Sequence, residues 1–369
     1  MKVKVFALLF LGFLCKVVVA QTETFRVMSY NLNYYKAPSA PCTPSISYSQ
    51  KDGYFKTVID SVLPDILTVN ELGAYSDNSG AISVLMNVLN TGGRNYYASG
   101  AYSNNNYSSI VNQLFYNGNK FALQKQENIA SSPNNISLTR VIDIYRLYYK
   151  DAGLGIAGVD TVFITVCIAH LKAGSSSSDE SDRQMEVTSL MDYIENNIGT
   201  GNVILCGDLN LYSSSETAYQ TLTNYTSNPS IKFYDPLSSP GDWNNNGSFS
   251  NIHTQSTHHS GSGCYVGGGL DDRFDFILAS YPLIAGNKKM LYKTGTYKAF
   301  GQDGNHFNSS VNYGSNNAVS TTIADALYNF SDHLPLIADF EVLVSGLSVD
   351  DMDRMGREIN VKNPATHEI

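Results

Sequence analysis

The sequence contains little charge and few cysteines. Only 15% of its 369 residues are charged, and 24 basic residues are outnumbered by 33 acidic ones, which gives a formal net charge of −9 at pH 7. Net charge governs solubility and how readily a protein meets charged partners. The negative net charge therefore excludes a generic binder of polyanions, but it allows a site with local basic residues. No two cysteines have the Cys-x-x-Cys spacing, which argues against a structural zinc site.

The first twenty residues have the layout of a cleavable secretory signal. Lys2 and Lys4 precede an apolar stretch that ends in Val18–Ala20. A membrane anchor is the alternative, but the apolar run Val5–Cys15 is too short to span a bilayer and Lys16 interrupts it. We therefore predict cleavage after Ala20, a secreted protein and no stable insertion into a membrane.

Four cysteines remain after such a cleavage. Cys167 and Cys206 lie within apolar segments, and we interpret them as small core residues. Cys42 and Cys264 lie in loop-like sequence and are therefore the pair that could be joined outside the cytoplasm. The sequence thus suggests a disulfide between Cys42 and Cys264.

Apolar runs of strand length alternate with a few helical patterns, which favours an α/β sandwich over an all-β or a helical fold. The predicted strands are Phe25–Asn31, Ile66–Asn70, Ile110–Tyr116, Phe121–Asn128, Val141–Tyr149, Val162–His170, Val203–Gly207, Phe274–Ala279 and Leu336–Val344. Helical periodicity covers Tyr54–Val62, Ile82–Leu89 and Glu180–Ile194, and polar residues 175–182 provide the N-cap of the third helix. No change of composition divides the chain, so we predict one domain over residues 21–345 and a polar tail over residues 346–369.

Two long connections interrupt this pattern, Ser238–Leu270 and Tyr281–Asn329. Connections of this length are usually disordered insertions or substrate-facing loops, and we assign the substrate-facing role to the later one. The earlier one is rich in Gly, Ser and Asn and carries His253, His258 and His259. These histidines could bind a metal, but solvated loop residues are the favoured interpretation.

Polar side chains gather at the ends of the predicted strands. They lie in the segments VMSYNLN, PDILTVNEL, VFITVCIAHL, VILCGDLN, RFDFIL and FSDHLPL, and almost all follow an apolar run. The residues are Asn31, Glu71, His170, Asp208, Asn210, Asp275, Asp332 and His333. Acids, amides and imidazoles in such positions are what a divalent-metal site for phosphate ester cleavage requires.

Glu71 is the first choice for a metal ligand, because its charge emerges at the carboxyl end of a buried strand, where α/β proteins place their sites. Mg²⁺ keeps several waters and takes one or two protein carboxylates, so Glu71 with a nearby aspartate such as Asp332 would suffice. Mn²⁺ and Ca²⁺ are alternatives to Mg²⁺. Taken alone, Glu71 is equally compatible with an ordinary acid at the end of a strand.

Asp208 and Asn210 are two residues apart, which on an extended chain places both side chains on one face. They would orient a water and hold the phosphate that it attacks, and Asn31 would form similar hydrogen bonds. The segments Asn31–Asn33 and Asp208–Asn210 follow their strands in the same way, which fits two facing halves. Arg140 begins a Tyr-rich strand and is either a phosphate-binding residue or a plain surface arginine.

The two histidines have different surroundings. Asp275 is the natural partner of His333, because a carboxylate on one imidazole nitrogen fixes the tautomer and raises the basicity of the other. His170 provides a second imidazole, and the sequence does not identify the acid that orients it. A histidine considered singly is more often a hydrogen-bonded, partly buried residue, so the order and context of the whole set carry the hypothesis.

Taken together, N-x-N after the first strand, PDIL…E, HL followed by Arg183 and Gln184, GDLN, R-x-DFI and SDHLP resemble the endonuclease/exonuclease/phosphatase superfamily over residues 25–344. The resemblance implies a four-layer α/β sandwich and divalent-metal-dependent hydrolysis of phosphate esters. Asn33 stands where the abasic-site repair enzymes of the superfamily carry an acid, which leaves a second metal ligand open. The resemblance also implies a role for each matching residue. Asn31 and Glu71 match positions beside the metal, His170 matches the first catalytic histidine, and Asp208 and Asn210 match the positions that bind water and phosphate. Asp275, Asp332 and His333 match the last cluster of the family's motifs.

We expect Mg²⁺ on Glu71 to polarise a phosphoryl oxygen while Asp208, or the pair Asp275 and His333, activates water for in-line attack. His170 would protonate the leaving oxygen. The leading hypothesis is a monomeric, secreted nuclease that acts on DNA or RNA, because abundant Tyr and Asn can stack on and bond to exposed nucleotides.

Two other functions compete with the nuclease. A phospholipid or inositol-phosphate esterase ranks lower, because its one candidate membrane-entering loop, Lys293–Asn308, is polar. A non-catalytic binding module is disfavoured by the intact metal and histidine positions. The final segment INVKNPATHEI resembles the opening of the C-terminal sorting domain of the type IX secretion system, although Lys362 replaces its usual first proline, and a disordered tail is equally compatible.

Overall fold

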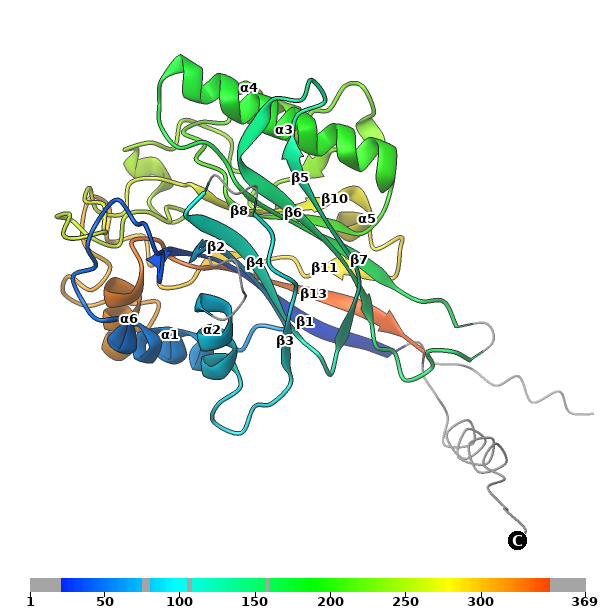
Figure 1. The fold of residues 1–369 in the computed structure, drawn as a ribbon, viewed down its shortest axis with the longest axis horizontal. Helices are drawn as coiled ribbons and strands as arrows, with labels where there is room; N and C mark the ends of the chain where they lie inside the picture. The colour runs from blue at the N-terminus through cyan, green and yellow to red at the C-terminus, as the bar shows by residue number, and fades with distance from the viewer. Residues whose placement is uncertain (1–20, 75–79, 105–107, 157–158, 346–369) are drawn as a thin grey trace, which may run out of the picture.

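The computed structural model describes residues 21–74, 80–104, 108–156 and 159–345. The predicted signal at residues 1–20 and the polar tail at residues 346–369 lie outside this part of the chain. Within it, two β-sheets pack against each other and helices cover their outer faces (Figure 1). This architecture confirms the predicted four-layer α/β sandwich. No helix in the described ranges is long and apolar enough to cross a membrane.

The first sheet has seven strands: β1 (Gln21–Tyr35), β2 (Ile66–Gly73), β3 (Tyr97–Ser99), β4 (Ile110–Asn117), β11 (Met290–Tyr292), β12 (Lys298–Ala299) and β13 (Leu336–Val344). Their order is β11-β13-β1-β2-β4-β3, and β12 also pairs with β13. β1 and β2 run parallel, so their carboxyl ends reach the same edge of the sheet. β13 runs antiparallel to β1, so the residues that precede β13 reach that edge too.

The second sheet has six strands: β5 (Phe121–Ser131), β6 (Ser137–Tyr149), β7 (Phe163–His170), β8 (Val203–Asp208), β9 (Phe233–Tyr234) and β10 (Asp275–Ser280). Their order is β5-β6-β7-β8-β10-β9. β7 and β8 run parallel, and β10 runs antiparallel to β8. The end of β7, the end of β8 and the start of β10 therefore lie side by side.

Helices cover both sheets. On the side of the first sheet lie α1 (Tyr48–Val62), α2 (Ala81–Leu89) and α6 (Thr321–Phe330), and on the side of the second lie α3 (Ser177–Asn197) and α4 (Thr217–Thr223) (Figure 1). The short helix α5 (Tyr281–Ala285) follows β10, and two 3₁₀ turns cover Pro229–Ile231 and Gly247–Phe249. Ser176 caps α3 through the backbone N–H of Asp179, which confirms that polar residues start this helix.

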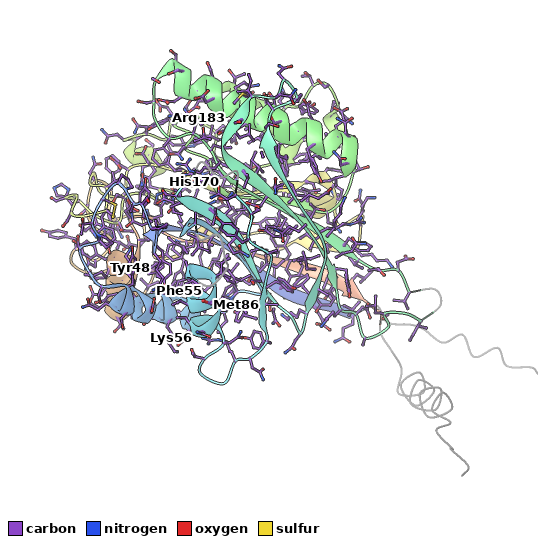
Figure 2. All side chains as sticks on the ribbon, in the orientation of Figure 1. Tyr48, Phe55, Lys56, Met86, His170 and Arg183 are labelled. Carbon is purple, nitrogen blue, oxygen red and sulfur yellow. A yellow bond between two sulfur atoms is a disulfide. The ribbon has the colours of Figure 1, made fainter. Side chains whose placement is uncertain are left out.

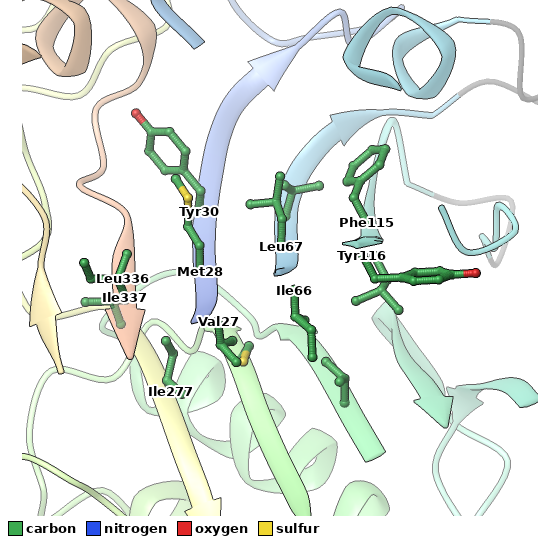
Figure 3. Close-up of a cluster of buried hydrophobic side chains, with 14 of the residues drawn as sticks. Val27, Met28, Tyr30, Ile66, Leu67, Phe115, Tyr116, Ile277, Leu336 and Ile337 are labelled. Carbon is green, nitrogen blue, oxygen red and sulfur yellow. The ribbon is translucent and has the colours of Figure 1, made fainter. Parts of the chain in front are cut away.

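The core is apolar on both faces of each sheet. One cluster fills the space between the sheets and continues under α1, α2 and α6, and a second lies between the second sheet and α3 with α4. Figure 3 shows Val27 of β1 next to Ile277 of β10, and Ile66 of β2 beside Val27 on the same face of the first sheet. Because both faces of β1 are covered, Met28 and Tyr30 on its other face are also fully buried.

The long strands and helices agree with the sequence prediction, and the short elements do not. Each predicted strand and helix is present, often with a few more residues at its ends. The strands β3, β9, β11 and β12 and the helices α4, α5 and α6 were not predicted. The interpretation of Tyr281–Asn329 as one irregular connection is therefore wrong, because it contains α5, β11, β12 and all but the last residue of α6.

Two of the three loop histidines are buried, so their interpretation as solvated residues is wrong. The ring nitrogens of His253 face the carbonyl oxygens of Leu270 and Trp243 at 3.2 and 2.9 Å. The ring of His258 stacks between those of Tyr265 and Tyr328, with centroids 4.1 and 3.9 Å apart. Backbone carbonyls and aromatic rings thus satisfy both imidazoles in the interior, whereas His259 is exposed.

The cysteine prediction is confirmed. Cys42 and Cys264 form a disulfide that joins residues 222 positions apart, and Cys167 and Cys206 are free and buried. The disulfide ties the segment before α1 to the loop before β10. Both of these segments lie next to the strand ends that carry the polar residues.

Candidate active site

Strand pairing brings the predicted site residues together. In the second sheet, Asp208 at the end of β8 pairs with His170 of β7 on one side and with Asp275 of β10 on the other. Residues that pair across neighbouring strands project to the same face, so these three side chains form a row. In the first sheet, Asn31 of β1 pairs with the residue before Glu71 in β2. The two rows face each other at one edge of the sandwich.

Two similar turns follow β1 and β8. The backbone N–H of Asn33 donates to Asn31 Oδ1 at 2.9 Å, and that of Asn210 donates to Asp208 Oδ1 at 3.0 Å. Asn33 and Asn210 both have φ near 50°, a left-handed conformation that Asn tolerates. The expectation that Asp208 and Asn210 share a face on an extended chain is therefore wrong, because the chain turns between them. The similarity of the two turns agrees with the repeat seen in the sequence.

Glu71 lies at an irregular position in β2. Its φ is 57°, and the register between β2 and β4 shifts between Val69 and Leu72. Such irregularities re-aim a side chain and are common next to functional sites. Glu71 Oε2 accepts the backbone N–H of Tyr34 at 2.9 Å, and Oε1 accepts Asn31 Nδ2 at 3.2 Å.

Three side chains offer ligand atoms for a divalent cation. Glu71 Oε1, His170 Nε2 and Asp208 Oδ2 all lie within 4.8 Å of one another. His170 Nε2 is 3.8 Å from the Glu71 oxygen and 3.6 Å from the Asp208 oxygen. Asn31 Nδ2 donates to both carboxylates and so fixes their spacing, with 3.0 Å to Asp208 Oδ2. Two carboxylate oxygens and one imidazole nitrogen fit a divalent cation, and the identity of the ion follows from none of these contacts.

Burial sets the protonation of this group. It raises the pKa of Asp208 to about 7, although the positive charge of His333 opposes the shift. It also raises the pKa of Glu71, and the charge of Asp332 adds to this. Burial lowers the pKa of His170 well below its ordinary value, and the charges of Arg140 and His333 act in the same direction. A neutral imidazole beside two carboxyl groups is suited to donate one hydrogen bond or to bind a metal.

His333 has the predicted partner. Its Nδ1 lies 2.8 Å from Asp275 Oδ2, and its Nε2 lies 2.7 Å from Gln255 Nε2 and 3.8 Å from Asp208 Oδ2. Burial lowers the pKa of His333, but the carboxylates of Asp275 and Asp208 outweigh burial and raise the pKa well above its ordinary value. The Asp275 carboxylate therefore favours a positively charged imidazole, whose Nε2–H needs the oxygen of the Gln255 amide, in place of its nitrogen, as acceptor.

Asp332 lies beside this group and is held by neutral donors. Its Oδ1 accepts Asn33 Nδ2 and its Oδ2 accepts the backbone N–H of Val266, both at 2.9 Å. Within the described ranges, Asp332 is not among the residues that converge as possible metal ligands. Its proposed role as a ligand stays a prediction.

The polar residues surround a cavity of about 250 Å³. Its wall includes Glu71, His170, Asp208, Asn210, Asp332 and His333, with Arg140, Tyr34, Tyr212, Gln255, Cys264, Val266 and Phe274. Asn31 and Asp275 lie behind this wall and are fully buried. The loop Ser238–Leu270 contributes three of the lining residues, whereas Tyr281–Asn329 contributes none, so the cavity wall does not support the assignment of the substrate-facing role to the later loop.

Arg140 faces the cavity and is not a plain surface residue. It is partly buried, and its Nη1 donates to the carbonyl oxygens of His170 and Leu171 at 3.4 and 3.2 Å. Among the described residues, no carboxylate lies within 4 Å of its guanidinium. Arg140 therefore keeps hydrogen-bond donors for an anionic group in the cavity.

Buried polar residues brace the loops around the cavity. Arg183 of α3 binds Glu216 and donates to the carbonyl oxygens of Lys172 and Gly174, which ties the loop after β7 to the loop after β8. Figure 2 shows His170 between Arg183 of α3 and Phe55 of α1. The loop that follows His170 is thus fixed from the helical side.

A chain of buried amides joins the two sheets behind the site. Asn70 Oδ1 accepts the backbone N–H of Asp208 at 3.1 Å, and Asn70 Nδ2 donates to Asn112 Oδ1 at 2.7 Å. Asn112 in turn donates to Asp143 Oδ2 at 3.3 Å, and Ser103 donates to the other Asp143 oxygen. These hydrogen bonds between buried amides set the distance between the strand that carries Glu71 and the strand that carries Asp208.

Sequence reasoning missed Asn70, Asn112, Gln255 and Lys51. Asn70 and Asn112 are amides within mainly apolar predicted strands and were visible there, whereas Lys51 precedes the predicted helix Tyr54–Val62, so no pattern included it. Gln255 lies in an irregular loop and left no such signal.

Comparison with known proteins agrees with this geometry. No family model and no curated protein matches the sequence. Among solved structures, the human Nocturnin catalytic domain with a bound sulfate anion has a TM-score of 0.54 and 17% identity, and the match covers 87% of this chain and 97% of that one. The chain has the endonuclease/exonuclease/phosphatase fold.

Two further structures support this fold. TDP2 from D. rerio, complexed with a single-strand DNA product, has a TM-score of 0.51 and 10% identity, with 86% and 98% of the two chains covered. An endonuclease/exonuclease/phosphatase family protein from Bacteroides thetaiotaomicron has a TM-score of 0.51 and 14% identity, with 87% and 99% covered. The fold that the sequence motifs implied is thereby confirmed.

Proposed function

We propose that the protein is a divalent-metal-dependent phosphodiesterase, and specifically a nuclease. The observation that carries the proposal is the convergence of Glu71, His170 and Asp208 on one point, with the pair Asp275 and His333 beside it. A bound divalent cation, which we take to be Mg²⁺, would be held by Glu71 and would polarise a phosphoryl oxygen, and Asp208 and His170 would lie beside the ion without binding it. Mn²⁺ and Ca²⁺ are alternatives for the same donors.

Each residue then has a separate role. Asp208, whose pKa of about 7 suits proton uptake near neutral pH, accepts the proton of the attacking water. His333, kept positive by Asp275, stabilises the charge on the phosphoryl group. Arg140 and Asn210 orient the phosphate from the wall of the cavity. Neutral His170 donates a hydrogen bond to the leaving oxygen and is a weaker proton donor than the sequence suggested.

A nucleic acid fits the surroundings of the cavity better than a lipid. Tyr34 and Tyr212 are half-buried at the wall and offer ring faces on which unpaired bases can stack. The TDP2 structure with single-strand DNA product provides a parallel for such a substrate in the same fold. The cavity accommodates one phosphodiester group with a cation, and the chain on either side would run over the rim.

The deciding experiment compares plasmid nicking and RNA cleavage with hydrolysis of sphingomyelin and of inositol phosphates, each with and without a chelator. We expect cleavage of nucleic acid that disappears on chelation and returns with Mg²⁺. Asp208→Asn and His333→Ala should each lower the rate by at least about 10²-fold, because both act on the reacting groups.

The matched control is His259→Ala, which removes an exposed imidazole that does not line the cavity. Its rate should equal that of the wild type. Hydrolysis of lipid or inositol phosphate without cleavage of nucleic acid would replace the proposed substrate, and full activity in the presence of chelator would refute the metal dependence.

We also propose that the protein is exported and acts outside the cytoplasm as a monomer. The disulfide between Cys42 and Cys264 supports export, because disulfides persist in oxidising compartments. N-terminal sequencing of the mature protein from the culture medium should begin at Gln21. Recovery of the intact N-terminus in the cytoplasmic fraction alone would refute this proposal.

A further inference from the structure

A lysine occupies a core-facing position of α1. The buried residues of this helix are Lys51, Phe55, Val58, Ile59 and Val62, which follow the spacing of an apolar stripe. Lys51 is only 1% exposed, although lysine is almost never fully buried unless it is paired. Its position therefore calls for an explanation beyond the packing of the helix.

The ammonium group of Lys51 has no carboxylate partner within 4 Å among the residues that the structure describes. Its hydrogen bonds go to Asn33, with 3.3 Å to the backbone oxygen and 3.4 Å to Oδ1. The rings of Tyr265 and Phe330 lie 5.1 and 5.6 Å from Nζ and provide cation–π contacts. The charge is thus held in place by an amide and by two aromatic faces.

Asn33 connects this charge to the cavity. Its Oδ1 faces Lys51, while its Nδ2 donates to Asp332 Oδ1 and to the carbonyl oxygen of Cys264. The second oxygen of Asp332 is taken by the N–H of Val266. Protein donors therefore occupy both oxygens of Asp332.

We propose that Lys51 is a fixed counter-charge for Asp332, acting through Asn33, and that the cavity consequently binds one divalent cation and not two. The inference rests on the proposed metal-dependent function and specifies its stoichiometry. Lys51 is a positioning residue, because it contacts Asn33 and does not reach the cavity wall itself.

The charges around the cavity agree with this assignment. Four carboxyl groups lie in or behind it, those of Glu71, Asp208, Asp275 and Asp332, and the positive groups are His333, Arg140 and Lys51. Burial lowers the pKa of Lys51 to about 8, and the charges of Asp332 and Glu71 oppose the shift. The side chain is therefore still mainly protonated at pH 7.

The test is a Mn²⁺ titration of the full mature chain, in which the electron paramagnetic resonance signal of the free ion gives the number bound. We expect one ion per wild-type chain and none at the same concentrations for Glu71→Gln. Lys51→Met keeps the packing and removes the charge, so it should bind the ion roughly tenfold more tightly, since a unit charge near a divalent ion is lost. Asn33→Asp in the Lys51→Met background should bind two ions.

The matched control is Lys289→Met, which removes an exposed lysine paired with Asp160 outside the cavity and should leave the affinity unchanged. If Lys51→Met does not fold, Lys51→Gln retains a donor to Asn33 without the charge and answers the same question. Two ions in the wild type, or unchanged affinity in both Lys51 variants, would overturn the inference. If the wild type binds one Mn²⁺ but hydrolyses no phosphate ester, only the proposed function is overturned. If the wild type binds no Mn²⁺, the proposed function and the inference about Lys51 are both overturned.

Discussion

At the scale of single residues, the two histidines of the cavity differ in protonation: the pKa of His170 is lowered and that of His333 is raised. Both rings are buried, and burial alone favours the neutral form of each. His333 differs because the Asp275 carboxylate lies against its Nδ1, whereas His170 has two carboxylates near Nε2 but no partner for Nδ1 in the described ranges. One acid at the start of β10, in the facing sheet, is therefore enough to separate their roles.

Asp275→Asn tests this difference. The amide removes the negative charge, so burial should dominate and the pKa of His333 should fall, as read from the titration of its ring protons by NMR. Cleavage at neutral pH should drop by about 10²–10⁴-fold, the range expected when a positioned charged imidazole is lost. A variant whose His333 titrates as in the wild type would contradict the role of Asp275.

Glu186 gives a prediction about stability. It is 1% exposed, and burial raises its pKa to about 7 although the N–H of Lys172 donates to its Oε2. Between about pH 4.5 and 7 the unfolded chain releases this proton before the folded chain does, so stability falls as the pH rises through that window. Glu186→Gln should therefore raise the free energy of unfolding at pH 8 by about 1–3 kcal/mol and have little effect at pH 4. Urea unfolding at both pH values measures this, and equal effects at the two would be inconsistent with a buried carboxylate.

At the scale of elements, length and pattern decided what the sequence could predict. β1, β7 and α3 are long, and the apolar residues of each are arranged as a strand or a helix requires, so the sequence predicted their existence and type. β9 and β12 have two residues each and exist only because a neighbouring strand offers free backbone groups, which no local pattern records. The left-handed turn at Asn210 is different, because its acceptor Asp208 is only two residues away and the turn is therefore local.

The candidate site residues could be proposed from the sequence because they end strands, whereas the residues that hold them in place could not be paired with them. Glu71, Asp208 and Asp275 could be proposed from their position after or at the start of apolar runs. The contact of Asn33 with Asp332 spans 299 positions, and that of Asn70 with Asp208 spans 138, so their partners became visible only in three dimensions.

The amide chain between the sheets leads to a prediction at this scale. Asn112→Leu would leave Asn70 and Asp143 without their partner, which should cost about 2–4 kcal/mol of stability. It should also lower the activity of the folded fraction, because the spacing between Glu71 and Asp208 is no longer fixed. Urea unfolding and the rate per folded molecule give the two quantities.

Asn202→Leu is the matched control for this prediction. Asn202 is also buried and donates to two carbonyl oxygens, those of Phe163 and Lys288, but it lies at the opposite end of β7. It should destabilise the fold to a similar degree and leave the activity of the folded molecules intact. Equal losses of activity in both variants would show that the amide chain has no particular connection to the site.

At the scale of the whole molecule, the disulfide links stability with activity. Closing a segment of 222 positions restricts the unfolded chain strongly, so Cys42→Ser should lower the free energy of unfolding by about 2–5 kcal/mol. The loop that carries Cys264 also provides the acceptor for Asn33 and the donor for Asp332, so the folded variant should lose activity as well. Thermal unfolding and cleavage assays with and without reductant measure both effects, and retention of the wild-type melting temperature after reduction would contradict them.

The antiparallel pairing of β1 and β13 has a practical consequence. Gln21 pairs with Val344, and the strands run from there to the cavity edge at Asn31 and His333, about 33 Å away at the usual rise per residue (Figure 1). A tether attached at either of these positions would leave the mouth of the cavity pointing away from the support. In a protein attached to a bead through such a tether, the cavity should therefore remain accessible to long polymers in solution.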